Sequence, residues 1–365
     1  MELTSFTTPY EYQQFVDFIY RVYRGNPCFK DTLTGIVRTF LHRTDTFTRQ
    51  AHLRPLIVRS RGEIVAQCIF IATPQLPVLQ IGFFEALPAQ QDAVEMLLKE
   101  AASECRVLGL NKIVAGLNGH LSYGVGFLND HHDSPISFDC LYSPAYYLAY
   151  FRRYASREMT LTTFAFEMAH VTLAPALARR AYQHFAFRPM DMHRFHEEIL
   201  LFGALCNQCL ADTYLYFTRE PECLYELLKE LRPFLRAEHL IFAYHDGVPV
   251  GFIFWHPDIN MIVPGGRRVS FWEIGLRYLL HHRRISSIKI NAIGVTPAYQ
   301  HSAVVAGLIA ETIRYAQSRY RAGETNFIWD SNTASIQLNR RIMDGEYRHY
   351  SVFEFTPGDF DDGSL

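Results

Sequence analysis

Long apolar runs are missing from this 365-residue chain. No stretch approaches the roughly 18 consecutive apolar residues needed to cross a bilayer, so we expect no membrane partner. The first residues, MELTSFTTPYEYQQF, lack the basic and apolar regions of a secretory signal. These absences predict a cytoplasmic protein.

An excess of charge of one sign is also missing. Lys plus Arg number 35 and Asp plus Glu 37, for a formal net charge of −2. Nucleic-acid binding needs a basic domain or stripe, so we expect no nucleic-acid partner. Arg283-Arg284 and the other arginine pairs are short and separated, which is typical of solvated surface. An apolar helical stretch is followed by His281, His282, Arg283 and Arg284. Basic groups at the carboxyl end of a helix complement its dipole.

A metal or disulfide framework is not indicated either. The seven cysteines are odd in number and scattered, which favours free thiols. Cys206 and Cys209 form a lone C-x-x-C without the second pair that a structural zinc site needs, and we expect them to pack on a helix. His131-His132-Asp133 is interpreted as a polar loop. The sequence therefore predicts no metal site.

Apolar and aromatic residues are plentiful, at 49% and 14% of the chain. This composition supports a packed core, and the length fits two domains. The first half predicts a helix over 9–23 that starts at Thr8-Pro9, a hairpin over 55–74 that turns at Arg61-Gly62, a strand over 78–86, a helix around 93–105 and a strand over 112–117.

The second half repeats this order. It predicts helices over 193–209 and 221–232, a hairpin that turns at Asp246-Gly247, a strand over 286–295, a helix over 303–320, a strand over 325–330, a helix capped by Asn332 and a last strand over 347–355. We therefore expect an α/β (α+β) fold of two tandem domains, residues 1–178 and 179–365. Each would be a mixed, mostly antiparallel sheet flanked by helices.

The segment from Ile293 to Leu308 reads I-G-V-T-P-A-Y-Q-H-S-A-V-V-A-G-L. It resembles the acetyl-CoA loop of the GCN5-related N-acetyltransferase (GNAT) superfamily, in which a strand ends in V-x-P-x-Y/H and a Q/R-x-x-G-x-G/A loop opens a helix. The hairpin HDGVPVGF and the segment Trp329-Asp330-Ser331-Asn332 also resemble this superfamily. D-S-P at 133–135 and YSPAYYLAYF at 142–151 resemble a bacterial family of uncharacterised tandem acetyltransferase-like proteins.

The resemblance implies that acetyl-CoA or another acyl-CoA is the cosubstrate. Its binding residues would be Ile293, Gly294, Val295, Gln300, His301, Ser302, Ala303, Val304, Val305 and Asn332. The physical basis is anion binding by free amides and the dipole at a helix start. The chain departs from the pattern at Ala303, where the family has glycine, and at Val305, where it has glycine or alanine. It departs again at Asn339, where many relatives have a proton-donating tyrosine.

The predicted reaction is transfer of an acyl group, by resemblance an acetyl group, to a primary amine of a small molecule or peptide. Glu273 and Asp330 are candidate bases, and Tyr347 is a third candidate catalytic residue. One alternative is a non-catalytic binding protein of the same fold with a degenerate cofactor loop. Another is a transferase that uses aminoacyl-tRNA. The protein would be a monomer or a homodimer.

The N-terminal domain is expected to be degenerate. Its glycine-rich segment from Gly116 to Gly126 lacks the Q/R-x-x-G-x-G/A pattern. This segment, with Tyr142, Tyr146, Tyr147 and Tyr150, is hypothesised to form a lid or one wall of the acceptor pocket.

Overall fold

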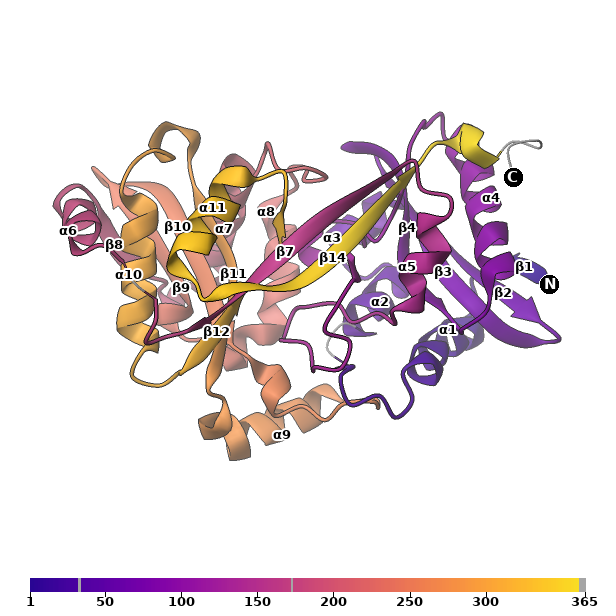
Figure 1. Ribbon diagram of the computed structural model, residues 1–365, viewed down its shortest axis with the longest axis horizontal. Helices are drawn as coiled ribbons and strands as arrows, with labels where there is room; N and C mark the ends of the chain where they lie inside the picture. Colours follow the sequence, from indigo (N-terminus) through magenta and orange to yellow (C-terminus); the bar gives the residue numbers. More distant parts are fainter. Residues whose placement is uncertain (32–33, 172, 361–365) are drawn as a thin grey trace. The chain divides into compact units, whose positions relative to one another are not determined.

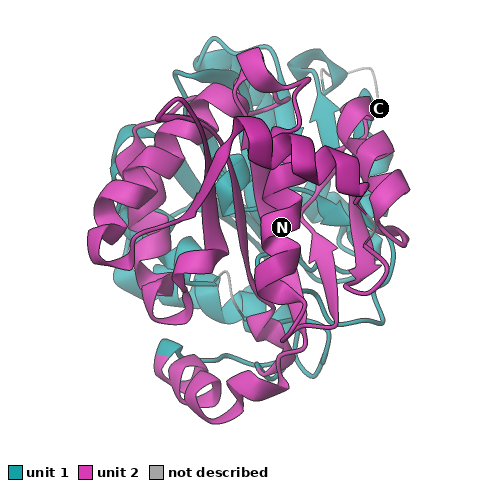
Figure 2. Ribbon diagram, turned by 90° about the vertical axis from the view of Figure 1, so that its left-hand side faces the viewer, with its two compact units in different colours: residues 1–161, 263–271, 348–365 teal, residues 162–262, 272–347 magenta. Residues whose placement is uncertain are grey.

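The computed structural model describes residues 1–31, 34–171 and 173–360 (Figure 1). Its contacts divide the chain into two compact units (Figure 2). Unit 1 comprises Met1–Leu161, Val263–Phe271 and Arg348–Leu365, and unit 2 comprises Thr162–Ile262 and Trp272–Tyr347.

Unit 1 is built on a sheet with the strand order β1-β2-β3-β4-β5-β14. These strands are β1 (Glu2–Ser5), β2 (His52–Ser60), β3 (Glu63–Thr73), β4 (Leu76–Ala86), β5 (Ile113–Ala115) and β14 (Gly345–Phe355). Neighbours are antiparallel except β4 and β5, which are parallel. A short strand, β6 (Phe127–Leu128), also pairs with β14.

The helices of unit 1 are α1 (Pro9–Val22), α2 (Thr34–His42), α3 (Thr46–Gln50), α4 (Gln91–Val107) and α5 (Tyr146–Arg152). Single-turn 3-10 segments cover Leu121–Tyr123 and Pro357–Phe360. The predicted start of α1 is confirmed, because Thr8 and Glu11 form a capping box and Pro9 occupies the first turn. The crossover that parallel strands require is supplied by α4, which connects β4 to β5.

Unit 2 has the strand order β8-β9-β10-β11-β12-β7. These strands are β8 (Ala186–Pro189), β9 (Leu240–His245), β10 (Val248–Pro257), β11 (Ser287–Val295), β12 (Ala322–Thr325) and β7 (Arg157–Glu167), and β13 (Ile328–Trp329) pairs with β7. Neighbours are antiparallel except β11 and β12, which are parallel.

The helices of unit 2 are α6 (Pro175–His184), α7 (Phe195–Cys209), α8 (Pro221–Leu228), α9 (Phe271–His281), α10 (Val304–Ala316) and α11 (Thr333–Ile342). The 3-10 segments are Met192–Arg194, Lys229–Phe234, Ala237–His239, Ile259–Met261, His282–Arg284 and Pro297–Tyr299. Among the described residues, no helix has the length and hydropathy needed to cross a membrane.

The two units share one plan. In each, a run of antiparallel strands is followed by a helix and a parallel strand, and this parallel strand has an antiparallel neighbour on its other side, β14 in unit 1 and β7 in unit 2. This confirms the predicted mixed, mostly antiparallel sheets flanked by helices. The units do not divide the chain at residues 178 and 179. The last strand, β14, pairs with β5 of unit 1, and the second half of β7 pairs with β12 of unit 2.

Both faces of the unit 2 sheet are buried. Phe242 of β9 and Phe252 of β10 pack with the α7 residues Ile199 and Phe202 on one face. On the other face, Ile241 of β9 and Ile253 of β10 pack with the α10 residues Val304 and Leu308. Alternation along each strand therefore supplies apolar side chains to helices on both sides.

Both predicted hairpin turns are confirmed. Arg61 and Gly62 have φ values of 53° and 84°, and Asp246 and Gly247 have 48° and 78°. Positive φ at both central residues is typical of the type I′ turn that fits strand twist. The single strand predicted over 325–330 is wrong. The pairing of β12 with β11 ends at Thr325, and the chain forms a separate strand at Ile328–Trp329.

Two helix-interior glycines make a matched test of packing. A Cβ at Gly307 of α10 would lie 2.0 Å from the Phe187 ring, whereas one at Gly275 of α9 would meet nothing within 4 Å. We expect Gly307→Ala to lower the free energy of unfolding by about 1–3 kcal/mol through overpacking. Gly275→Ala should raise it by about 0.5–1 kcal/mol through helix propensity. Denaturant titration measures both, and equal effects would contradict the packing assignment.

Candidate functional site

The central feature of unit 2 is a parting of two parallel strands. β11 and β12 are in register only from Ser287 and Ala322 to Ile290 and Thr325. The amide of Asn326 still donates to the Ile290 carbonyl at 2.7 Å. Beyond this point β11 continues to Val295 with β10 as its paired neighbour. The edge of Ala292–Val295 that faces away from β10 is thus not paired with β12 and can bond an extended ligand through its backbone.

The predicted cofactor residues of β11 lie on this parted segment. Ile293 is 36% exposed, whereas Gly294 and Val295 are buried. A Cβ at Gly294 would lie 2.7 Å from the Phe252 ring and 2.8 Å from the Cβ of Cys209. Glycine at this position is therefore explained by the close approach of α7 to β11.

The loop after β11 leads directly to the amino end of α10. Ala303 is the N-cap residue, with φ −80°, and its side chain makes no capping hydrogen bond. Ser302 Oγ accepts from the Val304 amide at 3.3 Å and donates to the Tyr299 carbonyl at 2.6 Å. The first turn contains no acidic residue. Its amides and the helix dipole thus form a positive end that favours an anion.

The two departures from the family's loop pattern fit the helix start. Ala303 has a negative φ, and Val305 is not among the described residues with positive φ. Val305 is partly buried against the cluster that contains Ile253 and Leu308. No left-handed backbone is needed at either position, so the absence of glycine causes no strain there.

The other predicted site residues have local partners. Glu273 accepts from Arg277 Nε at 2.8 Å within α9. Asp330 follows β13, is exposed, and accepts from the Thr162 hydroxyl at 2.8 Å. Asn332 is the confirmed N-cap of α11, since its side chain accepts from the Ser335 amide at 3.1 Å. Gln300 and His301 lie in the loop, and Tyr347 is half-buried in β14.

A buried ion pair, which the sequence did not indicate, lies where β11 and β12 still pair. Lys289 is fully buried, and its Nζ donates to the Thr325 carbonyl at 2.9 Å. The same Nζ lies 3.6 Å from Glu324 Oε1, which also accepts from the Thr163 hydroxyl at 2.9 Å. These contacts join β11, β12 and β7 immediately before the strands part.

In unit 1 the corresponding segment is occupied by the protein's own tyrosines. β4 pairs with β5 from Leu79 to Ile81, and Leu87–Gln90 then connect β4 to α4. The Tyr147 hydroxyl accepts from the Ala86 amide at 2.8 Å, and the Tyr150 hydroxyl accepts from the Gln90 amide at 2.9 Å. Tyr150 also donates to the Leu87 carbonyl at 2.6 Å. Two backbone amides of this segment, those of Ala86 and Gln90, are therefore bonded within the protein.

The glycine-rich segment does not lie at the counterpart of the cofactor-like loop. It follows β5, which corresponds to β12 and not to β11. A Cβ at Gly119 would lie 2.8 Å from the rings of Phe40 and Phe47, and one at Gly126 would lie 2.6 Å from Tyr350. The glycines at these two positions permit close packing at positive φ.

A cavity of about 80 Å³ lies beside β4 in unit 1. Tyr23, Lys30, Glu85 and Asn118 are among its lining residues. Glu85 accepts from the Tyr147 hydroxyl at 2.7 Å. Burial raises the pKa of Glu85 to about 8, although hydrogen bonds from Tyr147 and Tyr23 act in the opposite direction. Such a carboxyl is the kind of titratable group that the sequence could not distinguish from a surface glutamate.

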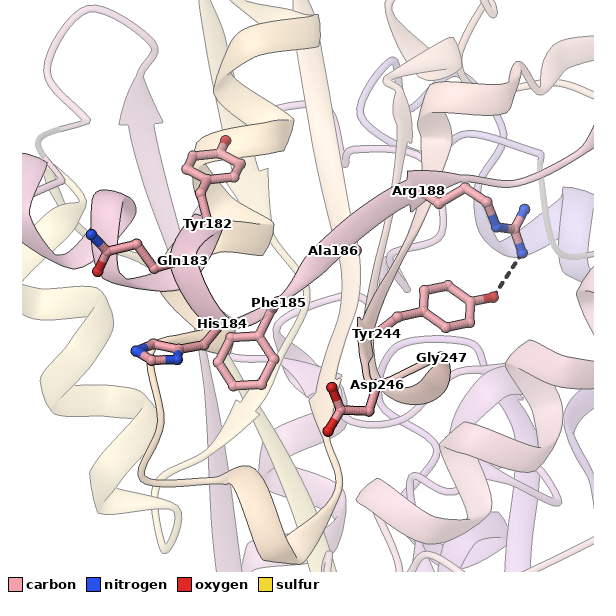
Figure 3. A pocket seen from close by; sticks show the side chains of 9 residues that line it. All are labelled: Tyr182, Gln183, His184, Phe185, Ala186, Arg188, Tyr244, Asp246 and Gly247. Atoms are coloured by element: carbon pink, nitrogen blue, oxygen red, sulfur yellow. Dashed lines mark hydrogen bonds between the residues drawn. The ribbon is translucent and has the colours of Figure 1, made fainter.

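An open hollow of about 620 Å³ lies at the outer edge of the unit 2 sheet (Figure 3). It is lined by Tyr182, Gln183, His184, Phe185, Ala186, Arg188, Tyr244, Asp246 and Gly247. Arg188 donates to the Tyr244 hydroxyl at 2.8 Å and to Glu198 at 3.0 Å. Because β9 and β10 separate this edge from β11, the hollow is not the parted-strand site.

The C-x-x-C cysteines and His132 lie on a helix and beside a backbone carbonyl, respectively. Cys206 and Cys209 lie on α7, and burial raises the pKa of the Cys209 thiol to about 12. His132 Nδ1 lies 3.2 Å from the Ser143 carbonyl. Within the described residues, no three His, Cys, Asp or Glu side chains are grouped closely enough to hold a metal ion.

Comparison with known proteins places this geometry in a class. No protein-family profile and no curated protein sequence matches the chain. A tandem GNAT protein from the clavulanic acid biosynthesis pathway aligns over 98% of both chains, with 12% identity and a TM-score of 0.56. A GCN5-related N-acetyltransferase from Sphaerobacter thermophilus aligns over 97% of this chain and 96% of that chain, with 11% identity and a TM-score of 0.52.

A third similar structure is the GCN5-related glucosamine N-acetyltransferase region of a fungal multi-domain GH3 β-N-acetylglucosaminidase. It covers 97% of this chain and 38% of that chain, with 13% identity and a TM-score of 0.59. The chain therefore has the GNAT acetyltransferase fold. More particularly, it has the tandem form of that fold along almost its whole described length. The resemblance deduced from residues 293–308 is confirmed at the level of the fold.

The buried ion pair yields a stability prediction. Lys289→Met removes the cation and leaves the Glu324 carboxylate buried, so the free energy of unfolding should fall by about 3–5 kcal/mol. Adding Glu324→Gln should recover part of this loss, because no buried charge then remains. Urea titration of the single and double variants measures the effect. A double variant less stable than Lys289→Met would contradict this account.

The raised pKa of Glu85 predicts a pH dependence. The folded pKa is about 8 and the unfolded value about 4.5, so Glu85 stabilises the fold fully below pH 4.5 and progressively less up to pH 8. Glu85→Gln removes this titration. As pH rises through this window, the free energy of unfolding of the variant should increase relative to that of the wild type by on the order of 1.4 kcal/mol per pH unit. If the free energies of unfolding of both proteins changed with pH in parallel, the raised pKa of Glu85 would be contradicted.

Proposed function

We propose that the chain is an acyl-CoA-dependent N-acyltransferase whose cosubstrate binds in unit 2. The observation that carries the proposal is the parting of β11 from β12 next to the amino end of α10, where the N-cap side chain makes no hydrogen bond. An extended ligand with a terminal pyrophosphate matches a free strand edge that leads to a helix start. Acetyl-CoA is the proposed donor, and a primary amine of a small molecule or peptide is the proposed acceptor.

The backbone of Ile293, Gly294 and Val295 would hold the extended part of the ligand and orient its acyl carbonyl. The loop residues Gln300, His301 and Ser302, with Ala303, Val304 and Val305, would hold the pyrophosphate through amides of the first turn of α10. The bound cosubstrate would supply an activated thioester carbonyl. The task of the protein is then mainly positioning and proton removal.

The amine must lose a proton to act as a nucleophile, and this proton needs an acceptor. Asp330 and Glu273 are the proposed bases, either directly or through water, and Tyr347 is the proposed third catalytic side chain. Asn332 is less suited to ligand binding, because its side chain already caps α11. Asn339 donates to the Ser335 carbonyl at 2.8 Å and cannot supply a proton to a leaving thiolate.

Unit 1 is proposed to be the degenerate half, without a cosubstrate of its own. Support comes from the hydroxyls of Tyr147 and Tyr150, which accept from the Ala86 amide at the end of β4 and from the Gln90 amide at the N-cap of α4. Under this proposal, acyl-CoA binds with a stoichiometry of one per chain.

A pair of charge variants at the two ends of α10 tests the cofactor site. His301→Glu places a carboxylate at the proposed pyrophosphate site, whereas Gln317→Glu makes the same charge change at the C-cap; both side chains are exposed. We expect His301→Glu to weaken acetyl-CoA binding about tenfold or more, and Gln317→Glu to leave it nearly unchanged. Isothermal titration calorimetry with acetyl-CoA and longer acyl-CoAs measures both.

Equal loss in the two variants would place the ligand elsewhere. Absence of binding in the wild type at millimolar acyl-CoA would favour the non-catalytic alternative, and retention of tRNA in a filter assay would favour the aminoacyl-tRNA alternative.

A further inference from the structure

The helix α9 presents apolar side chains to solvent. Trp272, Leu276, Leu279 and Leu280 are 86%, 58%, 74% and 66% exposed, and no residue of α9 is buried. Their spacing of four, three and one residues puts them on one face of the helix. A surface helix normally turns such a face towards a core, so this exposed stripe indicates a binding surface.

The opposite face of α9 attaches the helix to unit 2. The Tyr278 ring packs edge-on against Phe234 with centroids 5.0 Å apart, and Arg277 forms an ion pair with Glu273 at 2.8 Å. Arg277 also donates to the Ile262 carbonyl at 3.5 Å. The helix is therefore held through its other residues, which leaves the apolar stripe outward.

Positive charge gathers at both ends of this helix. Arg267 and Arg268 precede it and Arg283 and Arg284 follow it, and all of them are exposed. His281 and His282 add further basic groups at the carboxyl end. The sequence from residue 267 to residue 284 contains one acidic residue, Glu273, and it forms an ion pair with Arg277. The whole chain has a formal charge of −2, so this cationic character is local.

We propose that α9 docks the protein on an anionic lipid bilayer. Trp272 and the three leucines would enter the boundary between headgroups and acyl chains, while the four arginines would contact anionic headgroups. The helix has 11 residues, about half the length needed to span the hydrocarbon, so it lies in the surface. This proposal does not depend on the reaction assigned to the parted strands.

A second copy of the chain fits the stripe less well. Both ends of α9 are cationic, so pairing two copies of the helix in either direction brings arginines near arginines. Like charges in contact disfavour association, whereas an anionic bilayer complements both ends at once.

The intrinsic fluorescence of the protein offers a direct readout. The chain has three tryptophans, and Trp255 and Trp329 are buried at 1% and 6% exposure. A change in emission on docking therefore reports on Trp272. The full chain is mixed with vesicles of phosphatidylcholine containing about 30% phosphatidylserine, and with vesicles of phosphatidylcholine alone. We expect a blue shift and co-sedimentation with the anionic vesicles, both reduced at about 0.5 M salt.

Three double variants complete the test. Leu276→Gln with Leu279→Gln should reduce co-sedimentation at least tenfold, and Arg283→Gln with Arg284→Gln should weaken it and flatten its salt dependence. The control replaces exposed apolar residues on other helices, Val107→Gln with Leu177→Gln, and should bind as the wild type does.

Wild-type protein that stays in the supernatant with both vesicle types would overturn the proposal. Undiminished binding of the leucine variant would do the same. A wild-type dimer in analytical ultracentrifugation that the leucine variant converts to a monomer would assign the stripe to a second copy instead.

Discussion

The site of this protein depends on how far two parallel strands stay paired. The register of β11 with β12 ends at Ile290 and Thr325, with one more backbone bond from Asn326, and the buried Lys289 and Glu324 lie in the last part of that pairing. Beyond it, Ala292–Val295 keep β10 as their partner, and their other edge is not paired with β12 up to the loop that starts α10. A longer pairing would close this edge and leave only the helix terminus, which alone could not hold an extended ligand.

The two units share one arrangement of strands and helices but differ in which side chains bond the backbone near the starts of α10 and α4. In unit 2 the N-cap residue of α10, Ala303, makes no side-chain capping bond, and the Ser302 hydroxyl accepts from the Val304 amide. In unit 1 the hydroxyls of Tyr147 and Tyr150 from α5 accept from the Ala86 amide of β4 and from the Gln90 amide at the N-cap of α4. These bonds support the proposal that the two units, which share one sheet geometry, differ in their capacity to bind a phosphate.

Much of the fold could be predicted from local sequence. Thr8-Pro9 and Glu11 specify the start of α1, and Asp246-Gly247 specifies a tight turn, because both depend on the conformations of a few adjacent residues. The loop from Ile293 to Val305 was recognisable for the same reason. The expectation of no membrane partner rested on the lack of a spanning segment. It did not address α9, whose apolar stripe is visible only when its exposed face is known.

The sequence by itself determined the order of helices and strands, their turns and caps, and the position of the cofactor-like loop, since these features follow from backbone preferences and side-chain periodicity. Only the tertiary structure decided where β12 leaves β11, that β14 pairs with β5, and that tyrosines of α5 cap the backbone near α4. These features join residues far apart in the chain. Each is selected by burial and hydrogen-bond satisfaction in three dimensions, which no local pattern encodes.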